Sequence, residues 1–322
     1  MSCPDCFTGS VLEGTPTGVI SDIDSAYFAS GSPDGNSNTK RNDYRLKLNN
    51  PKIIADQFAL HLKCDVWVPD FFQGHPPVNE FQMKSLPDRA GKKLGVFGLL
   101  RTIAVALPSI PSFISNRGSV VDARVVSFIK KIQEQKKYEK IGVIGYCFGG
   151  GIASRVGAAT NIFDSIVLAH QETRPTPRLT PSRLAPTAWA QPEEDMGISA
   201  ERLKKIEELY ASRKGKDTYV DYEIQVYKAH GFAARPNFAY PDVKAGFEGA
   251  FKQAVEWYNK TIPGQALVAI SNSRCTSPLL ERPTREHRAA PSSAREFSGF
   301  AMEGDQVSGM MRFGPNERSQ TP

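Results

Sequence analysis

The sequence has few cysteines and no long uninterrupted run of apolar residues. Its five cysteines are an odd number, which argues against a disulfide framework. The first twenty residues hold no basic region followed by an apolar one, so secretion is not expected. The most apolar long stretch, residues 94–114, contains Arg101, Pro108 and Pro111 and is too interrupted to span a bilayer. We therefore expect a cytoplasmic protein with reduced thiols that does not bind a membrane.

Dense positive charge is also lacking, although the chain is mildly basic. Its formal net charge is +6 and its pI is about 9.0. The nearest approach to a cluster is the segment 130–137, which holds four lysines and which we interpret as the solvated face of a helix. A nucleic-acid groove normally shows denser basic residues with aromatic residues between them. We therefore expect no nucleic-acid partner.

Signals for a metal or a cofactor are equally sparse. Cys3 and Cys6 have the spacing of a metal-binding pair, but no second pair follows. The glycines of residues 145–151 do not have the spacing of a dinucleotide-binding loop, and no ribose-binding acid follows a next strand. The sequence therefore predicts a protein without metal and without cofactor.

What the chain does contain is a regular alternation of helical and strand patterns. The predicted elements are a helix over 51–63, a strand over 65–69, a helix from 121, strands over 140–145, 165–169 and 186–190, a helix over 200–213, a strand over 220–226 and a helix over 243–258. This alternation predicts an α/β domain with a mainly parallel sheet flanked by helices on both faces. We assign residues 1–262 to this domain. Residues 263–322, in which Ser, Pro, Arg and Gly become frequent, are predicted to be a disordered tail.

The strongest local signal is the segment 145–151, where Cys147 is flanked by glycines after a buried strand and before a helical run. This is the Gly-x-nucleophile-x-Gly elbow, with cysteine as the nucleophile. The sharp turn lifts the nucleophile above the end of the strand, and the glycines remove β-carbons that would collide. The helix N-terminus favours a thiolate, and the N–H of Phe148 is placed to donate to a substrate oxyanion. The alternative is a structural cysteine in an ordinary glycine-rich turn.

A cysteine nucleophile needs a histidine base and an acid that orients the histidine. In the elbow-type fold the nucleophile, the acid and the histidine follow one another along the chain. Asp195 follows the predicted strand over 186–190, and His230 follows the predicted strand over 220–226. Both residues lie in loops at the carboxyl ends of strands, the edge of the sheet where Cys147 also emerges. We therefore predict a catalytic triad of Cys147, His230 and Asp195.

The alternatives to these two partners are few. Glu193 and Glu194 are possible orienting acids in place of Asp195. The chain has only five histidines, and we interpret the other four as structural or solvated. They are His61 in a predicted helix, His75 in a loop, His287 in the tail and His170, which precedes Asp195 and so breaks the expected order.

With these residues in hand, the chain resembles the dienelactone hydrolase family, particularly its fungal members. The resemblance covers roughly residues 1–262. It rests on Met1-Ser2-Cys3-Pro4-Asp5-Cys6-Phe7, on Asp65-Val66-Trp67-Val68-Pro69-Asp70, on the elbow at 145–150, on Glu193-Glu194-Asp195 and on His230-Gly231-Phe232. It implies an α/β-hydrolase fold and a Cys-His-Asp triad that cleaves a carboxylic ester or lactone, as carboxymethylenebutenolidases do, through an acyl-enzyme. Arg235 is a candidate for holding a substrate carboxylate, and Tyr146 is a second candidate substrate-binding residue.

The chain also departs from the family pattern. Family members carry an apolar strand and a loop that supplies a second oxyanion N–H before the helix at residue 51, whereas the interval 40–50 has neither. The interval between Tyr227 and His230 is about two residues short, and the tail has no counterpart in the resemblance. We therefore expect one central strand of the sheet to be missing.

These departures keep two other functions open. The first is a non-catalytic or degenerate binding protein that retains the α/β-hydrolase fold. The second is a thiol redox protein that uses Cys147. For the leading hypothesis, the expected partner is a small-molecule ester or lactone substrate, while its acyl group and the oligomeric state of the protein stay open.

Overall fold

The computed structural model describes residues 12–32, 49–74, 110–171, 185–193, 198–228, 232–233 and 236–271. The chain divides after Ser277 into two units, and every described element lies in the first of them. In chain order the elements are β1 (Val19–Ile20), β2 (Tyr27–Ala29), α2 (Asn50–Leu62), β3 (Val66–Val68), α5 (Ile110–Ser115), α6 (Gly118–Lys136), β4 (Ile141–Cys147), α7 (Phe148–Ala159), β5 (Ser165–Gln171), β6 (Thr187–Pro192), α8 (Ala200–Ala211), β7 (Tyr222–Tyr227), α9 (Pro241–Thr261) and β8 (Ala266–Ile270).

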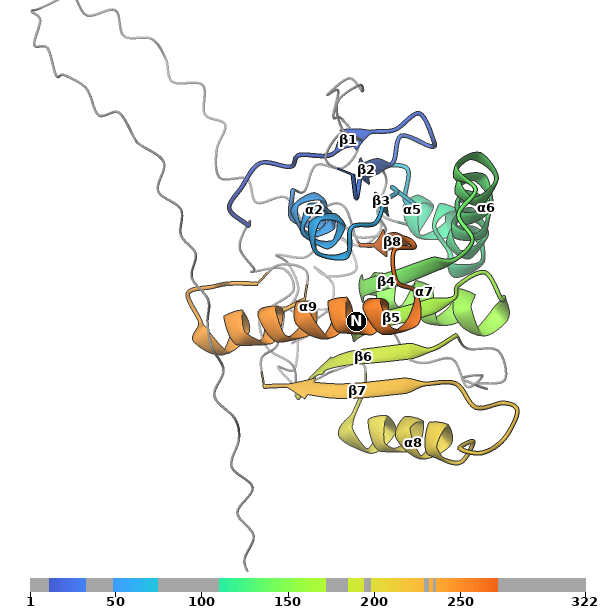
Figure 1. Cartoon of the computed structure of the whole chain (residues 1–322), viewed down its shortest axis with the longest axis vertical. Helices are drawn as coiled ribbons and strands as arrows, with labels where there is room; N and C mark the ends of the chain where they lie inside the picture. Colours follow the sequence, from blue (N-terminus) through green and yellow to red (C-terminus); the bar gives the residue numbers. More distant parts are fainter. Residues whose placement is uncertain are drawn as a thin grey trace, which may run out of the picture. The chain divides into compact units, whose positions relative to one another are not determined.

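The described strands form one mixed sheet in the order β1-β2-β3-β8-β4-β5-β6-β7 (Figure 1). β1 pairs with β2 and β2 with β3 in antiparallel fashion. Every neighbouring pair from β3 to β7 is parallel. The carboxyl ends of these parallel strands therefore meet at one edge, which is where open α/β sheets bind their ligands. The predicted α/β fold with a mainly parallel sheet is confirmed.

Helices cover both faces of the sheet and bury two apolar clusters. On one face α2 and α9 pack on the sheet, and Phe58 and Trp257 are fully buried there. On the other face α6, α7 and α8 cover the strands, and Phe128, Ile152 and Tyr210 are buried. Successive strand residues alternate between the two clusters because side chains along a strand point to opposite faces.

Local signals in the sequence account for several helix boundaries. A proline lies in the first turn of α2, where a backbone N–H has no partner within the helix, so its missing N–H costs no hydrogen bond. The hydroxyl of Ser199 accepts a hydrogen bond from the N–H of Arg202 at 3.3 Å, so Ser199 is the predicted N-cap of α8. The apolar stripe that begins at Val121 is the buried face of α6.

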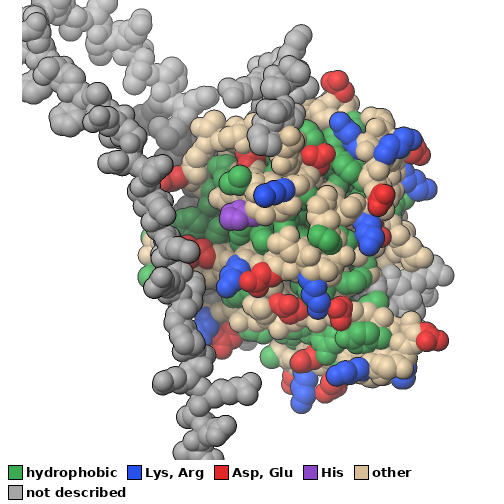
Figure 2. Space-filling model, in the orientation of Figure 1, with side chains coloured by type: hydrophobic (Ala, Val, Ile, Leu, Met, Phe, Trp, Pro, Cys, Tyr) green, Lys and Arg blue, Asp and Glu red, His purple; other side chains and the backbone are tan. Residues whose placement is uncertain are grey.

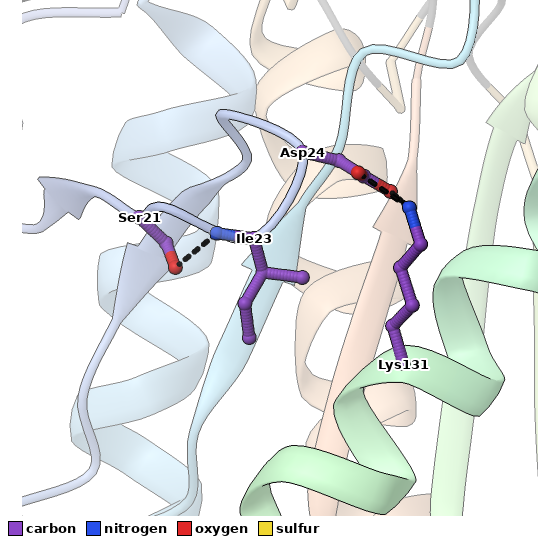
Figure 3. Close-up of polar contacts among 4 residues, drawn as sticks. All are labelled: Ser21, Ile23, Asp24 and Lys131. Atoms are coloured by element: carbon purple, nitrogen blue, oxygen red, sulfur yellow. Dashed lines mark hydrogen bonds and ion pairs between the residues drawn. The ribbon is translucent and has the colours of Figure 1, made fainter.

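The lysines of α6 lie on a solvated face, as predicted. Lys131 pairs with Asp24, in the turn between β1 and β2, at 2.7 Å, and the N–H of Ile23 donates to the Ser21 hydroxyl at 3.1 Å in the same turn (Figure 3). Both partners of the ion pair are 45% exposed, so the pair contributes little stability. Lys136 lies over the rings of Phe28 and Trp67. On the face shown in Figure 2, side chains of both charge signs are interspersed.

One strand of the sheet lies beyond residue 262, in the part of the chain that was predicted to be a tail. The absence of the strand that family members carry before residue 51 stays a prediction, because residues 33–48 lie outside the described residues. Residues 266–270 form β8, which lies between β3 and β4 and is parallel to both. All five residues of β8 are buried, and they contribute to both apolar clusters. The central position is therefore filled by a strand from the carboxyl-terminal side of α9. Residues 272–322 lie outside the described residues.

Candidate active site

The candidate site is built around the junction of β4 and α7. Cys147 is the last residue of β4 and the N-cap of α7, with φ 50° and ψ −117°. A non-glycine residue rarely adopts a positive φ, and such strain is concentrated at functional sites. The pairing of β4 with β5 shifts register between Tyr146 and Cys147, so the strand ends in an irregularity at this point. The side chain of Cys147 is partly exposed at the carboxyl edge of the sheet. The predicted sharp turn from strand to helix at Cys147 is confirmed, and the role of Cys147 as nucleophile stays a prediction.

The two glycines of the elbow are needed because of close contacts. A β-carbon on Gly145 would lie 2.5 Å from the carbonyl oxygen of Gly149 and 2.6 Å from the α-carbon of Gly150. A β-carbon on Gly149 would overlap the carbonyl oxygen of Ile270 in β8. Neither Gly145 nor Gly149 has a positive φ. The elbow therefore demands space at these positions, while Cys147 itself carries the unusual backbone conformation.

The N-cap of α7, Cys147, makes no side-chain capping bond. No side chain caps this helix at its N-terminus, and the first N–H groups of a helix have no partner within the helix. Phe148 supplies the first of these N–H groups. Its ring contacts Phe72 with a centroid distance of 5.7 Å, and it packs against the cluster under α6 and α7. The backbone that carries the predicted oxyanion donor is thus held by an aromatic contact.

The turn that carries Phe72 is itself fixed by hydrogen bonds. The carboxylate of Asp70 accepts from the N–H of Phe72 at 3.1 Å and from the N–H of Gly74 at 2.7 Å. The guanidinium of Arg124 donates to the carbonyl of Phe71 at 2.8 Å. These contacts place the end of β3 against the elbow. Phe72 could not be identified as part of the site from the sequence, because its contact with Phe148 joins residues far apart in the chain.

The segments that carry the predicted partners of Cys147 leave the sheet side by side. Pro192 at the end of β6 pairs with Tyr227 at the end of β7, and the N–H of Glu193 donates to the carbonyl of Tyr227 at 2.8 Å. The ring of Tyr227 packs on Phe232 with a centroid distance of 5.3 Å, and Phe232 is fully buried. The segment that contains His230 therefore begins and ends close to the carboxyl edge of β7.

Three of the predicted site residues lie outside the described residues, namely Asp195, His230 and Arg235. The catalytic triad and the carboxylate-binding role of Arg235 therefore stay predictions. Glu193, one of the alternative orienting acids, has an exposed side chain. Tyr146 is 7% exposed and belongs to the apolar cluster under α2 and α9, where burial raises the pKa of its hydroxyl.

Cys64 is more deeply buried than Cys147. Its side chain is 4% exposed, and burial, assisted by the charge of Asp65, raises the pKa of its thiol to about 12. A thiol of this kind stays protonated at neutral pH and is a poor nucleophile. Cys147 is therefore the better nucleophile of the two described cysteines.

The described part of the chain gives no evidence of a metal centre or of a membrane-spanning helix. It brings together no group of three or more His, Cys, Asp or Glu side chains that could hold a metal ion. Within the same residues, no helix is both long enough and apolar enough to cross a bilayer.

Comparison with known proteins identifies the elbow-bearing region. Residues 110–262 match the dienelactone hydrolase family. The resemblance drawn from the sequence is thereby confirmed, and the fold is that of the α/β-hydrolases. The matched residues include the turn at Cys147 but end before β8, which begins at Ala266.

Two named relatives align with most of the chain. The chain is 28% identical over 271 residues to Hydrolase tropI of Talaromyces stipitatus, and the alignment covers 79% of this chain and 94% of that protein. It is 26% identical over 220 residues to a carboxymethylenebutenolidase homolog of Xenopus tropicalis, which covers 67% of this chain and 78% of that protein. Together with the family match, these relatives support a hydrolase function.

Solved structures show only a distant likeness. The structure named m3DLH has a TM-score of 0.36 and 15% identity and covers 53% of this chain and 71% of that chain. The acylaminoacyl peptidase of Pyrococcus horikoshii has a TM-score of 0.37 and 11% identity and covers 50% of this chain and 30% of its own. A likeness this remote carries no argument about the reaction.

Proposed function

We propose that the chain hydrolyses carboxylic esters or lactones, with Cys147 as nucleophile, His230 as base and Asp195 orienting the histidine. The observation that carries the proposal is the strained conformation of Cys147 at the head of α7. A structural cysteine in an ordinary turn has no need of a positive φ, whereas a nucleophile that must project above the sheet does. This observation favours the nucleophile over a structural cysteine.

The proposed reaction has two halves. His230 takes the proton of the Cys147 thiol, and the thiolate sulfur attacks the carbonyl carbon while the oxyanion accepts a hydrogen bond from the N–H of Phe148. The C–O bond then breaks, the alcohol leaves with the proton from His230, and an acyl-enzyme remains. A water molecule that loses its proton to His230 attacks the thioester, which releases the carboxylic acid and restores the thiol. In a lactone the alcohol and the acid are parts of one product.

Other features complete the proposal. Arg235 and Tyr146 stay proposed substrate-binding residues, the first for a carboxylate of the substrate. The odd number of cysteines supports a cytoplasmic location. Cys64, the only other cysteine among the described residues, is buried and stays protonated, so it would be a poor resolving thiol for a redox function.

The test compares two cysteine variants with activated aryl esters as substrates. Cys147→Ala is expected to lower kcat by about 10³-fold or more and to prevent formation of an acyl-enzyme that intact-protein mass spectrometry detects in the wild type. Cys64→Ala serves as the control and should retain turnover and acylation. Turnover retained by Cys147→Ala would exclude this cysteine as the nucleophile. A folded wild-type protein that is never acylated would instead identify a non-catalytic binding protein.

A further inference from the structure

Gln191 is a buried amide without a partner at the active edge of the sheet. Its side chain is 1% exposed, and neither Nε2 nor Oε1 has a hydrogen-bond partner. Buried polar atoms in native proteins are nearly always paired, so an amide that is unpaired at both ends requires an explanation. Gln191 is the penultimate residue of β6, directly before the segment in which the chain leaves the sheet.

The sheet register places Gln191 and Cys147 at the same carboxyl edge. Tyr146 pairs with Ala169 and Ala169 pairs with Ala190, so Gln191 lies one residue beyond this level, whereas Cys147 follows the register shift of β4 and pairs with Gln171. β4 and β6 are separated only by β5, which puts their backbones about 10 Å apart. Gln191 and Cys147 therefore face the same edge at a separation that a ring-bearing acyl group can span.

Alternation along β6 fixes the face to which Gln191 points. Trp189 belongs to the cluster under α6, α7 and α8, and Gln191 follows it by two residues. α7, whose N-terminus carries Cys147, packs on this same face, and Ile152 of α7 lies in the same cluster. The Gln191 amide is thus on the side of the sheet from which the elbow rises.

Gln253 shows what a purely structural buried glutamine looks like in this fold. It is 2% exposed, yet its Nε2 donates to the carbonyl of Trp189 at 3.3 Å and its Oε1 accepts from the hydroxyl of Tyr227 at 3.1 Å. Among the described residues, the other buried side-chain atoms without a partner are single atoms of Trp189, Tyr210, Arg213 and Trp257. Gln191 differs in lacking a partner at both ends.

We propose that Gln191 is a substrate-binding residue that recognises a hydroxyl group on the acyl part of the substrate. This proposal rests on the proposed ester or lactone hydrolysis. A primary amide donates through nitrogen and accepts through oxygen, and a hydroxyl group can accept from Nε2 and donate to Oε1. Because the amide is closed to solvent, a substrate that lacks the hydroxyl would leave it unpaired, and such sites discriminate strongly against the incomplete substrate.

The test uses two matched variants, Gln191→Met and Gln253→Met, which keep side-chain length and remove the amide. The probes are the p-nitrophenyl esters of benzoic acid and of p-hydroxybenzoic acid, together with p-hydroxybenzoate itself as a ligand in thermal unfolding. We expect the wild type to prefer the hydroxylated ester in kcat/KM by about tenfold or more and Gln191→Met to lose this preference while it still cleaves the plain benzoate. Gln253→Met should keep the preference.

Thermal unfolding of the ligand-free proteins separates a binding role from a structural one. Gln191→Met should unfold at a higher temperature than the wild type, because an unpaired buried amide is removed, whereas Gln253→Met should unfold at a lower one. A lower unfolding temperature for Gln191→Met would mean that its amide is paired, for example by a buried water only, and would overturn the proposal. An unchanged ester preference in that variant would also overturn it.

The same experiment distinguishes failure of the proposed reaction from failure of this site. If the wild type cleaves neither ester but p-hydroxybenzoate raises its unfolding temperature, and Gln191→Met abolishes the rise, the amide site stands and the hydrolase proposal falls. If neither turnover nor a ligand-induced rise is seen, the role of Gln191 is refuted.

Discussion

The carbonyl oxygen of Ile270 occupies the space in which a β-carbon on Gly149 would lie. The turn that carries Cys147 thus lies in direct contact with β8, the last described strand of the chain. The geometry around Cys147 depends on a backbone contact with a residue more than a hundred positions later in the sequence. This contact gives a direct test of how β8 and the elbow depend on each other.

Gly149→Ala is expected to disrupt both stability and activity. The added methyl group meets backbone rather than a flexible side chain, so β8 or the elbow has to move, at a cost of about 1–3 kcal/mol or more. Urea unfolding and the rate of ester hydrolysis measure the two effects. Gly118→Ala is the control, because its β-carbon would come no closer than 3.6 Å to the side chain of Arg155. Equal stability of the two variants would show that the contact does not constrain the elbow.

Removal of β8 should unfold the domain, although β8 lies beyond the residues that match the family. A chain that stops after residue 262 loses the strand between β3 and β4 and leaves their backbone groups unpaired, whereas a chain that stops after residue 277 keeps it. We expect the longer chain to give a cooperative thermal transition and the shorter one to give none.

Leu267→Ala provides a milder test of the same strand. Loss of this fully buried side chain should lower the free energy of unfolding by about 2–5 kcal/mol. A folded chain of 262 residues would contradict the assignment of β8.

The sequence predicted the parts of the fold that rest on local chemistry. Ser199 is followed by a helix because its hydroxyl can cap the first turn, and Cys147 lies in an elbow because the flanking glycines leave room for one. β8 was missed because a five-residue apolar run after the last amphipathic helix has no periodicity that separates a strand from part of a tail. Its place in the sheet is set by its pairing with β3 and β4, which no local pattern encodes.

The candidate site also has a part that could be predicted from the sequence and a part that could not. Cys147 and Phe148 could be placed from the motif alone, because strand, turn and helix are contiguous there. The contact of Phe148 with Phe72 and the unpaired amide of Gln191 depend on which strands lie next to each other. Glutamine near the end of a strand is common, and only its burial without a partner distinguishes it. Asp195 and His230 rest on their order along the chain and stay predictions.

Because Cys147 has a positive φ, glycine at this position should give a more stable domain than alanine, which is the opposite of the usual effect of glycine. With φ 50° and ψ −117°, alanine at this position keeps the strained backbone, whereas glycine relieves it. We expect Cys147→Gly to be more stable than Cys147→Ala by about 1 kcal/mol, although both lack the proposed nucleophile. Urea unfolding of the two variants measures the difference. A more stable alanine variant would show that position 147 has an ordinary backbone conformation in solution.

The buried thiol of Cys64 should make the domain less stable in alkali. Its pKa is about 12 in the folded protein against 9.0 in an unperturbed thiol, because burial and the nearby charge of Asp65 oppose ionisation. The folded state therefore holds its proton at pH values where the unfolded chain has lost it. The stability from this group is complete below about pH 9 and falls as the pH rises toward about 12, by about 1 kcal/mol between pH 8 and pH 10.

Cys64→Ala isolates that contribution. The variant loses packing at every pH, but the fall in its free energy of unfolding between about pH 8 and about pH 10 should be smaller than that of the wild type by about 1 kcal/mol. Buried tyrosines such as Tyr138 and Tyr258, whose pKa values are also raised, act in both proteins and cancel in the comparison. The measurement is urea unfolding at the two pH values. Identical pH dependence in the two proteins would mean that the Cys64 thiol ionises in the folded state as readily as in the unfolded chain, and that solvent reaches the space between α2 and β3 in which it lies.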